Sequence, residues 1–215
     1  AEGGHTLKIA VRGEGNPRAA GKAVFLDKIQ CSAENGIVNP VAVKGPMEPQ
    51  RMIFGYTARE DYTDAEGHAW KPATEWIVRT GSGTDSVTAA WWTARRRFSI
   101  ENTPDPELYR YGVHAPEFRV NLTVAPGHTY QIRLKFAETR PGEPPTRAVT
   151  IAINGVIVQT DFDIAAAAGG MNRAMDLTFD GIAPSNGAIE VRLANTHGGE
   201  AILQALEAAP DSGGK

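Results

Sequence analysis

The sequence is poor in cysteine and has no long apolar run. Its one cysteine, Cys31, cannot form an intrachain disulfide, and no cysteine and histidine spacing matches a zinc site. We expect Cys31 to be a small buried apolar residue rather than a nucleophile. No stretch approaches the roughly 18 apolar residues of a membrane helix, so we expect no membrane partner. No signal peptide is recognisable, and we expect residues 1–4 to be a mature N-terminus or the start of a domain cut from a longer protein.

An excess of charge is also absent. The formal net charge is −3, from 22 Lys and Arg against 25 Asp and Glu, so nothing attracts the chain as a whole to nucleic acid. The only basic run, Arg95–Arg97, is too short to change this, and we expect it to be solvated. The glycine-containing stretch Gly13–Pro17 lacks a lysine and a following helix, so it does not match a phosphate-binding loop.

No convincing helix of three turns is present, whereas alternation of apolar and polar residues is frequent. It runs through Phe118–Val124, Tyr130–Phe136 and Ile189–Leu193, and Asn154-Gly155 is a strong two-residue hairpin signal. Several such strands separated by turn residues predict an all-β fold. We expect an antiparallel β-sandwich of the jelly-roll kind, with long loops at one end.

Proline and glycine near residues 45–49 suggest a boundary. We expect residues 1–49 to be an N-terminal extension that packs extra strands on the sandwich, and residues 50–209 to be the main domain. Residues 210–215 should be a disordered tail. A last strand is expected over Ala201–Glu207, and a helical turn over Ala165–Ala168 that ends at the glycines behind it.

Six fragments in order resemble the malectin-like domain, whose bacterial members are classed as carbohydrate-binding module family 57. They are MIFGY with DYTDAEGHAW, DPELYRYG with EFRVNLTV, YQIRLKFAE, VTIAINGVIV, DFDIAAAAGG and AILQALEAAP. The resemblance runs from about Arg51 to Ala208. It implies a β-sandwich that binds carbohydrate through loops at one end, often as a module appended to a glycoside hydrolase.

In this family the loops supply aromatic side chains and an acid to the sugar site. Here the loop before the Leu-Tyr segment offers three tryptophans, and Tyr111 follows that segment. Thr139-Arg140 replaces the two aromatics that follow Phe-Ala-Glu in the family, and Asn195–His197 stands where the acid is expected. The ligand-binding residues predicted on this basis are Trp76, Trp91, Trp92, Arg110, Tyr111, His114, Arg140, Asn195 and His197.

These residue types suit sugars, because an exposed ring can stack on the apolar face of a sugar while planar polar groups pair its hydroxyls. The arrangement needs neither a metal nor a nucleophile. Each residue also has a structural interpretation. Adjacent Trp91 and Trp92 face opposite sides of a strand, so one is expected in the core. Tyr109, in a strand-like stretch, is expected to pack in the core. The pattern fits core packing and ligand contact equally well for Tyr111. His114 and His197 also fit ordinary loop positions.

Catalytic and metal sites are weaker interpretations. A glycosidase needs two carboxyl groups at a defined separation. Of the available acids, Glu138 is expected to hold backbone or an arginine, and Asp161 and Asp163 to cap the helical turn or to order the loop. The triplet at Asn121 fits a glycosylation signal, but it lies mid-strand, where we expect a solvent-facing asparagine without a glycan.

Calcium is the one metal with a candidate site, because Asp61, Asp64 and Glu66 offer hard oxygen ligands without a full EF-hand pattern. Trp70, at the end of this polar turn, is expected to pack beneath it.

We therefore predict a non-catalytic carbohydrate-binding module, bacterial and secreted, without a cofactor. A catalytic domain in the same parent polypeptide is the expected partner, and the expected location is extracellular or periplasmic. The alternatives are a β-sandwich that binds proteins or mediates adhesion, and a small glycoside hydrolase or lyase.

Overall fold

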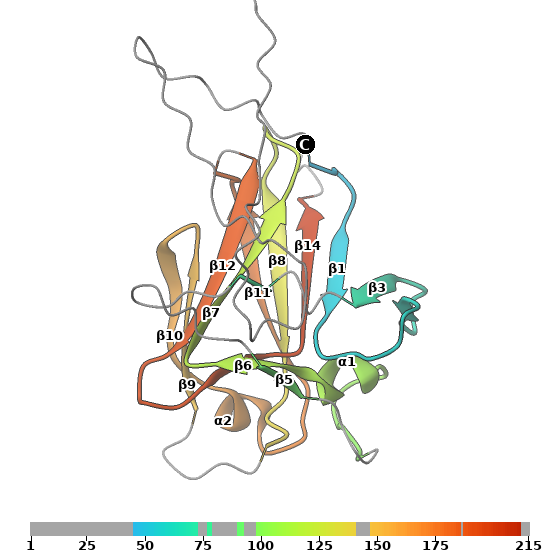
Figure 1. Cartoon of the computed structure of the whole chain (residues 1–215), viewed down its shortest axis with the longest axis vertical. Helices are drawn as coiled ribbons and strands as arrows, with labels where there is room; N and C mark the ends of the chain where they lie inside the picture. The colour runs from blue at the N-terminus through green and yellow to red at the C-terminus, as the bar shows by residue number, and fades with distance from the viewer. Residues whose placement is uncertain are drawn as a thin grey trace, which may run out of the picture. The chain divides into compact units, whose positions relative to one another are not determined.

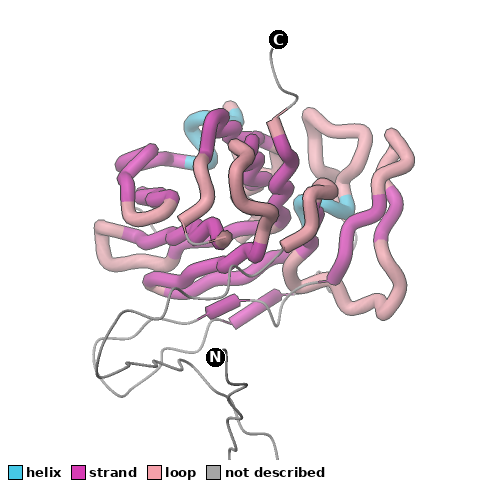
Figure 2. The backbone as a smooth tube through the Cα atoms, turned by 90° about the horizontal axis from the view of Figure 1, so that it is seen from above, coloured by secondary structure: helices cyan, strands magenta, loops and turns pink. Residues whose placement is uncertain are grey.

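The structure is a computed structural model that describes residues 45–72, 77–78, 90–92, 98–140, 147–185 and 187–211, with the backbone alone for 77–78 and 90–92. Strands dominate these residues, and the two short helices lie apart from each other (Figure 2). The first strands are β1 (Gln50–Ile53), β2 (Tyr62–Thr63), β3 (Ala69–Pro72), β4 (Ile77–Val78) and β5 (Ala90–Trp92). Then follow α1 (Glu107–Arg110), β6 (Gly112–Ala115), β7 (Glu117–Thr123), β8 (Tyr130–Phe136) and β9 (Ala148–Ile153). The last elements are β10 (Val156–Asp163), α2 (Ile164–Ala168), β11 (Met175–Ile182), β12 (Ala188–Asn195), β13 (Ala201–Leu203) and β14 (Ala205–Pro210).

Two sheets form the sandwich (Figure 1). One has the order β11-β8-β14-β1-β3-β2, and the other has the order β10-β9-β12-β7-β4. Neighbouring strands are antiparallel except β1 and β3, which run parallel. Apolar side chains of both sheets share one core, among them Leu134 of β8, Leu122 of β7 and Val191 of β12. The predicted all-β sandwich is confirmed.

The alternation seen in the sequence assigns the faces of the strands correctly. On β8, Ile132 and Leu134 are fully buried in the core, whereas Arg133 and Lys135 lie on the outer face of the sheet. The hairpin between β9 and β10 also forms as predicted, with Asn154 and Gly155 at φ 50° and 79°. Both residues of a type I′ turn need positive φ, which asparagine and glycine tolerate best.

The predicted last strand is in fact two strands in different sheets. It breaks at Gln204, which is fully buried although polar. The Gln204 side-chain amide donates to the carbonyl of Ala137, its backbone N–H donates to Lys135, and its carbonyl accepts from Phe54. β14 stays in the six-stranded sheet, while β13 joins a small sheet of order β13-β6-β5 that crosses one end of the sandwich (Figure 1). The apolar run alone cannot reveal this corner.

A second core lies on the outer face of the six-stranded sheet. Ile53 of β1, Trp70 of β3 and Tyr109 of α1 belong to it. Tyr109 is buried as expected, but its strand-like stretch is a helical turn. Pro106 directly precedes α1, and proline favours the start of a helix because its φ is fixed near the helical value.

The two ends of the described chain agree with the predicted organisation only in part. β14 runs through Pro210, one residue past the expected domain end, and the Asp211 amide donates to the carbonyl of Thr129. Residues 1–44 lie outside the described residues, so the proposed extension stays a prediction. In the described part of the chain, none of the helices has the length and apolar character that crossing a membrane requires.

The helical turn after β10 is capped as predicted. The Asp163 carboxylate accepts the backbone N–H of Ala166, and Gly169 ends α2 with φ 77°. Asn121, the residue of the possible glycosylation triplet, faces solvent in the middle of β7.

The turn between β2 and β3 is held by one carboxylate. Asp64 accepts the indole N–H of Trp70 at 2.8 Å and the backbone N–H groups of Glu66 and His68 at 3.0 and 2.8 Å. Trp70 therefore packs beneath its own turn, as expected. Burial opposes the charged form of Asp64. The Trp70 and backbone hydrogen bonds, with nearby His68, outweigh burial and hold the pKa of Asp64 below its ordinary value of 3.8.

Replacing one buried side chain of β7 should destabilise the fold far more than replacing its exposed neighbour. Leu122 is 1% exposed, so Leu122→Ala should lower the free energy of unfolding by about 2–5 kcal/mol, since it leaves a cavity. Asn121→Ala should change it by less than about 0.5 kcal/mol. Urea unfolding followed by tryptophan fluorescence measures both, and equal effects would contradict the assigned faces.

Asp64 should give the fold a measurable dependence on acid. A carboxyl group with a depressed pKa stabilises the fold above its unfolded pKa, and this contribution is lost as pH falls through the folded value. Asp64→Asn should lower stability at neutral pH by about 1–3 kcal/mol. It should also lose less stability on acidification through pH 3.8 than the unchanged protein. Parallel acid-unfolding curves for the two proteins would show that Asp64 makes no such contribution.

Candidate functional site

Polar side chains from four segments meet at the end of the sandwich that the β13-β6-β5 sheet crosses. His114 comes from β6, Arg140 from the segment after β8, Asn195 from the end of β12, and Glu200 directly precedes β13. Because hydrogen bonds join all four, segments far apart in sequence form one cluster, which we call the end cluster.

Glu200 is the centre of the end cluster. Its Oε2 lies 2.7 Å from His114 Nδ1 and accepts the Arg140 guanidinium at 3.1 Å. Its backbone carbonyl accepts the side-chain amide of Asn195 at 3.3 Å. The side chains of Glu200 and Arg140 are each 38% exposed, so both can reach a ligand while their partners hold them in place.

A buried ion pair supports the cluster from below. Arg147 Nε lies 2.6 Å from Glu138 Oε2, and the same guanidinium donates to the carbonyl of Glu200. Glu138 also accepts the backbone N–H of Arg140 at 3.2 Å. The prediction that Glu138 holds backbone or an arginine is therefore confirmed, and Glu138 fixes both sides of the Arg140–Glu200 contact.

A second, more open arm extends the end cluster toward the end of β10. The Asn195 side-chain oxygen Oδ1 accepts the backbone N–H of His197, which turns the loop. His197 Nε2 lies 3.7 Å from Asp161 Oδ1, and the Thr196 hydroxyl donates to the same oxygen at 3.2 Å. The His197 and Asp161 side chains are 54% and 64% exposed, so this arm is a solvated rim.

A family model described as the malectin domain matches residues 54–212. The chain belongs to the malectin-domain family. The order of motifs that suggested this resemblance is thereby confirmed.

Solved structures show the same malectin-like fold. The ANXUR2 extracellular domain from Arabidopsis thaliana aligns with a TM-score of 0.62 at 19% identity, over 76% of this chain and 49% of that one. A β-glucuronidase from Bacteroides uniformis aligns with a TM-score of 0.58 at 20% identity, over 75% of this chain and 18% of that one.

A third similar structure is the plant peptide RALF23 in complex with FER and LLG2. It aligns with a TM-score of 0.60 at 16% identity, over 75% of this chain and 48% of that one. This malectin domain thus spans about half of the plant chains it matches and a small part of the glucuronidase. No match was found among curated proteins.

Four of the nine predicted site residues of this malectin domain come together in the end cluster and its rim. They are His114, Arg140, Asn195 and His197. No acid stands at 195–197, but Glu200 lies five residues beyond Asn195 and belongs to the same cluster. The two glycines 198–199 carry the loop forward, so that the acid directly precedes β13. Sequence reasoning missed Glu200, although it directly precedes Ala201, where the last strand was expected to begin.

Arg110 and Tyr111 lie in a different environment. Arg110 is 9% exposed, and its guanidinium donates to the carbonyl of Phe98 at 3.0 Å and pairs with Glu107. The Tyr111 hydroxyl donates to the same Glu107 at 2.6 Å, and its ring packs edge-on against Tyr56. Burial, then the hydrogen bond and charge of Glu107, raise the pKa of Tyr111 to about 12. None of these contacts involves a residue of the end cluster.

The predicted tryptophans are only partly placed. Trp76 lies outside the described residues. The backbones of Trp91 and Trp92 lie in β5 and pair with Val113 and Gly112 of β6. The segment that bears them therefore runs beside the strand that carries His114. Their side chains lie outside the described residues, so which of the two is exposed stays open.

Neither calcium nor a carboxylate pair for glycoside hydrolysis gains support from the described part of the malectin domain. Asp64 is committed to its own turn, and Asp163 caps α2. Glu138 is engaged by Arg147. Among the described side chains, no group of three acids, histidines or cysteines is placed to hold a metal ion.

The Glu138–Arg147 pair should matter far more for stability than an exposed pair of the same length. Arg192 NH2 and Glu117 Oε2 are also 2.6 Å apart, but their side chains are 41% and 28% exposed, against 14% and 9% for Arg147 and Glu138. Glu138→Ala leaves a buried guanidinium unpaired and should cost about 3–5 kcal/mol of unfolding free energy. Glu117→Ala should cost about 0–1 kcal/mol. Thermal and urea unfolding of both variants provide the comparison, and similar losses would mean that burial does not set the effect.

Proposed function

We propose that this malectin domain is a non-catalytic carbohydrate-binding module and that the end cluster is its sugar site. The observation that carries the proposal is the convergence of His114, Arg140 and Asn195 on Glu200 at one end of the sandwich. Two segments from distant parts of the sequence thus supply an imidazole and a guanidinium to the Glu200 carboxylate, and a third supplies an amide to the Glu200 backbone carbonyl.

Such a set can recognise hydroxyl groups. Each sugar hydroxyl is both a donor and an acceptor, so it can donate to the Glu200 carboxylate and accept from the Arg140 guanidinium. Hydrogen bonds to charged groups are stronger than neutral ones. Because Glu138 and Arg147 hold the cluster from below, little side-chain freedom is lost on binding. The backbone of β5, which carries Trp91 and Trp92 in its sequence, pairs with β6 beside His114.

Attachment to a carbohydrate-active enzyme, in an extracellular or periplasmic setting, completes the proposal. In the Bacteroides β-glucuronidase the matching region is 18% of a much longer enzyme chain, and the Arabidopsis match is an extracellular domain. A module of this size on a secreted bacterial enzyme would hold the catalytic domain near its polysaccharide.

Removing either charge of the end cluster should weaken glycan binding. A glycan array should identify ligands, and calorimetry on the hits should give dissociation constants. Glu200→Gln and Arg140→Gln should each raise the dissociation constant about 10- to 100-fold, because each removes a charge-assisted hydrogen bond.

The matched control is Arg119→Gln, which removes another half-exposed arginine paired with a glutamate, on the outer face of β7. It should leave glycan binding unchanged. No binding to any glycan at millimolar concentration would reject the function. Binding that neither end-cluster variant weakens would reject the site.

A protein ligand is the second candidate. Val156 and Ile157, at the tip of the β9–β10 hairpin, are 65% and 60% exposed, which is unusual for adjacent large apolar side chains. β10 is the edge strand of its sheet. A similar structure contains a plant peptide with FER and LLG2. Peptides should therefore be tested alongside glycans in the same binding screen.

A further inference from the structure

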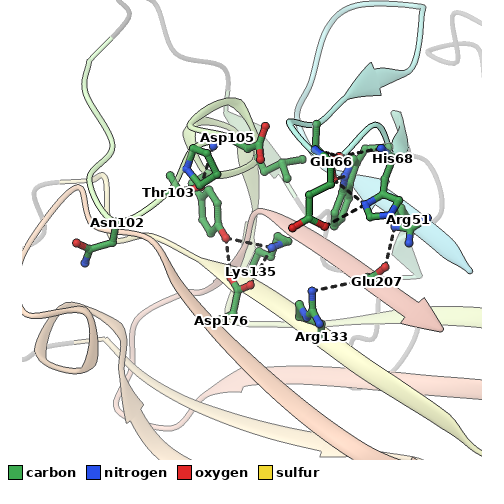
Figure 3. A pocket seen from close by; sticks show the side chains of 15 residues that line it. Arg51, Glu66, His68, Asn102, Thr103, Asp105, Arg133, Lys135, Asp176 and Glu207 are labelled. Carbon is green, nitrogen blue, oxygen red and sulfur yellow. Dashed lines mark hydrogen bonds and ion pairs between the residues drawn. The ribbon is translucent and has the colours of Figure 1, made fainter. Parts of the chain in front are cut away.

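A polar pocket lies on the outer face of the six-stranded sheet, on different elements from the end cluster (Figure 3). Its volume is about 250 Å³. Known ligand pockets begin at about 300 Å³, so this one has room for a single ring rather than a chain. We call it the sheet-face pocket. Charged and polar side chains dominate its floor and walls, among them Arg51, Glu66, His68, Arg133, Lys135 and Glu207.

The floor of the sheet-face pocket is a row of alternating charges across neighbouring strands. Arg51 of β1, Glu207 of β14 and Arg133 of β8 stand opposite one another in the strand register. Arg51 Nε lies 2.7 Å from one Glu207 oxygen, and Arg133 NH1 lies 3.4 Å from the other. Glu207 is thus clamped from both sides and keeps a fixed orientation.

Lys135 forms the second part of the floor. Its ammonium donates to Asp176 at 2.8 Å and to the Tyr109 hydroxyl at 3.1 Å, and it lies over the Trp70 and Tyr109 rings at 5.5 and 5.3 Å. An ammonium has three protons, and the contacts found among the described residues use two. The third can reach a ligand oxygen. The rings are buried, so they hold Lys135 in place rather than offer a stacking surface.

Two loops form the walls. The turn between β2 and β3 carries Glu66 and His68, which face the floor residues in Figure 3. The segment before α1 forms the opposite wall. Asp105 ties the walls together, since it accepts the Tyr62 hydroxyl at 3.0 Å and the Ala65 backbone N–H at 2.8 Å. The Glu66 side chain is 78% exposed, so one carboxylate at the rim is available to a ligand.

We propose that the sheet-face pocket binds one pyranose ring of a neutral saccharide, as a second site separate from the end cluster. Alternating carboxylates and cations suit vicinal hydroxyls, because each hydroxyl can accept from a cation and donate to the neighbouring carboxylate. The five lining carboxylates would repel an anion, and Arg51, Arg133 and Lys135 on the floor would repel a cation. The pocket therefore favours a neutral ligand. Because the Trp70 and Tyr109 rings of the lining are buried and offer no stacking surface, we expect an affinity in the millimolar range.

An NMR titration of the whole chain with methyl glycosides of glucose, galactose and mannose tests the proposal. At least one glycoside should give saturable shifts at the backbone amides of Glu66, Arg133 and Lys135. Arg133→Gln should weaken this binding about 10-fold, since it removes a charged donor from the floor. Glu66→Gln, at the exposed rim, should also weaken it and poses little risk to folding.

Two controls separate this site from the end cluster and from a general loss of charge. Arg192→Gln removes an arginine of similar exposure, also paired with a glutamate, on the opposite sheet, and should leave the titration unchanged. Glu200→Gln should weaken binding at the end cluster while the shifts at the sheet-face pocket and their saturation remain unchanged. The experiment can therefore reject the sheet-face pocket as a sugar site without rejecting the end cluster, and can reject the end cluster without rejecting the pocket.

Three results would overturn the second site. The first is the absence of saturable shifts in these amides with every glycoside at millimolar concentration. The second is an unchanged affinity in both Arg133→Gln and Glu66→Gln. The third is a response only to a lysine-containing peptide, which would assign the pocket to a cationic partner instead.

Discussion

The strict alternation of β8 is the constraint on which the rest of the structure depends. Its inward side chains, among them Ile132 and Leu134, fill the core between the two sheets. Its outward side chains, Arg133 and Lys135, build the floor of the sheet-face pocket. Because a strand has a period of two, a shift of one residue would exchange the two sets. The same strand register therefore sets both the apolar core and the polar outer face.

The end of β8 links this sheet to the end cluster. Ala137 turns into the second core, while Glu138 reaches Arg147 and the backbone beside Glu200. Gln204 bonds the Ala137 carbonyl from the other side and sends the chain from β13 into β14. One buried ion pair and one buried amide thus convert the end of a regular strand into a support for exposed polar groups. The cost of burying them is partly offset, because the Glu138 and Arg147 side chains pair with each other and the Gln204 side-chain N–H group donates to Ala137.

This division suits a binding domain whose relatives share less than a quarter of its residues. The core and the strand register preserve the fold, while the groups presented at the sandwich end and on the sheet face can change with little effect on stability. In this chain Arg140 is bonded to Glu200 at the sandwich end. The malectin fold identifies the scaffold, and in our proposal the end cluster decides what the scaffold binds.

Local patterns were sufficient for much of the architecture. Alternation in β7, β8 and β12, the Asn154-Gly155 turn and the cap at Asp163 depend on neighbouring residues, which is why each was predictable. The corner at Gln204, the helical form of the Tyr109 stretch and the gathering of His114, Arg140 and Asn195 around Glu200 depend on residues far away in the chain. Arg110 shows the same limit, because it suited a sugar site by its chemistry and pairs with Glu107 in the structure. Residue type and spacing determine which face of a strand a side chain occupies, whereas the partners it meets there are decided only when the sheets pack.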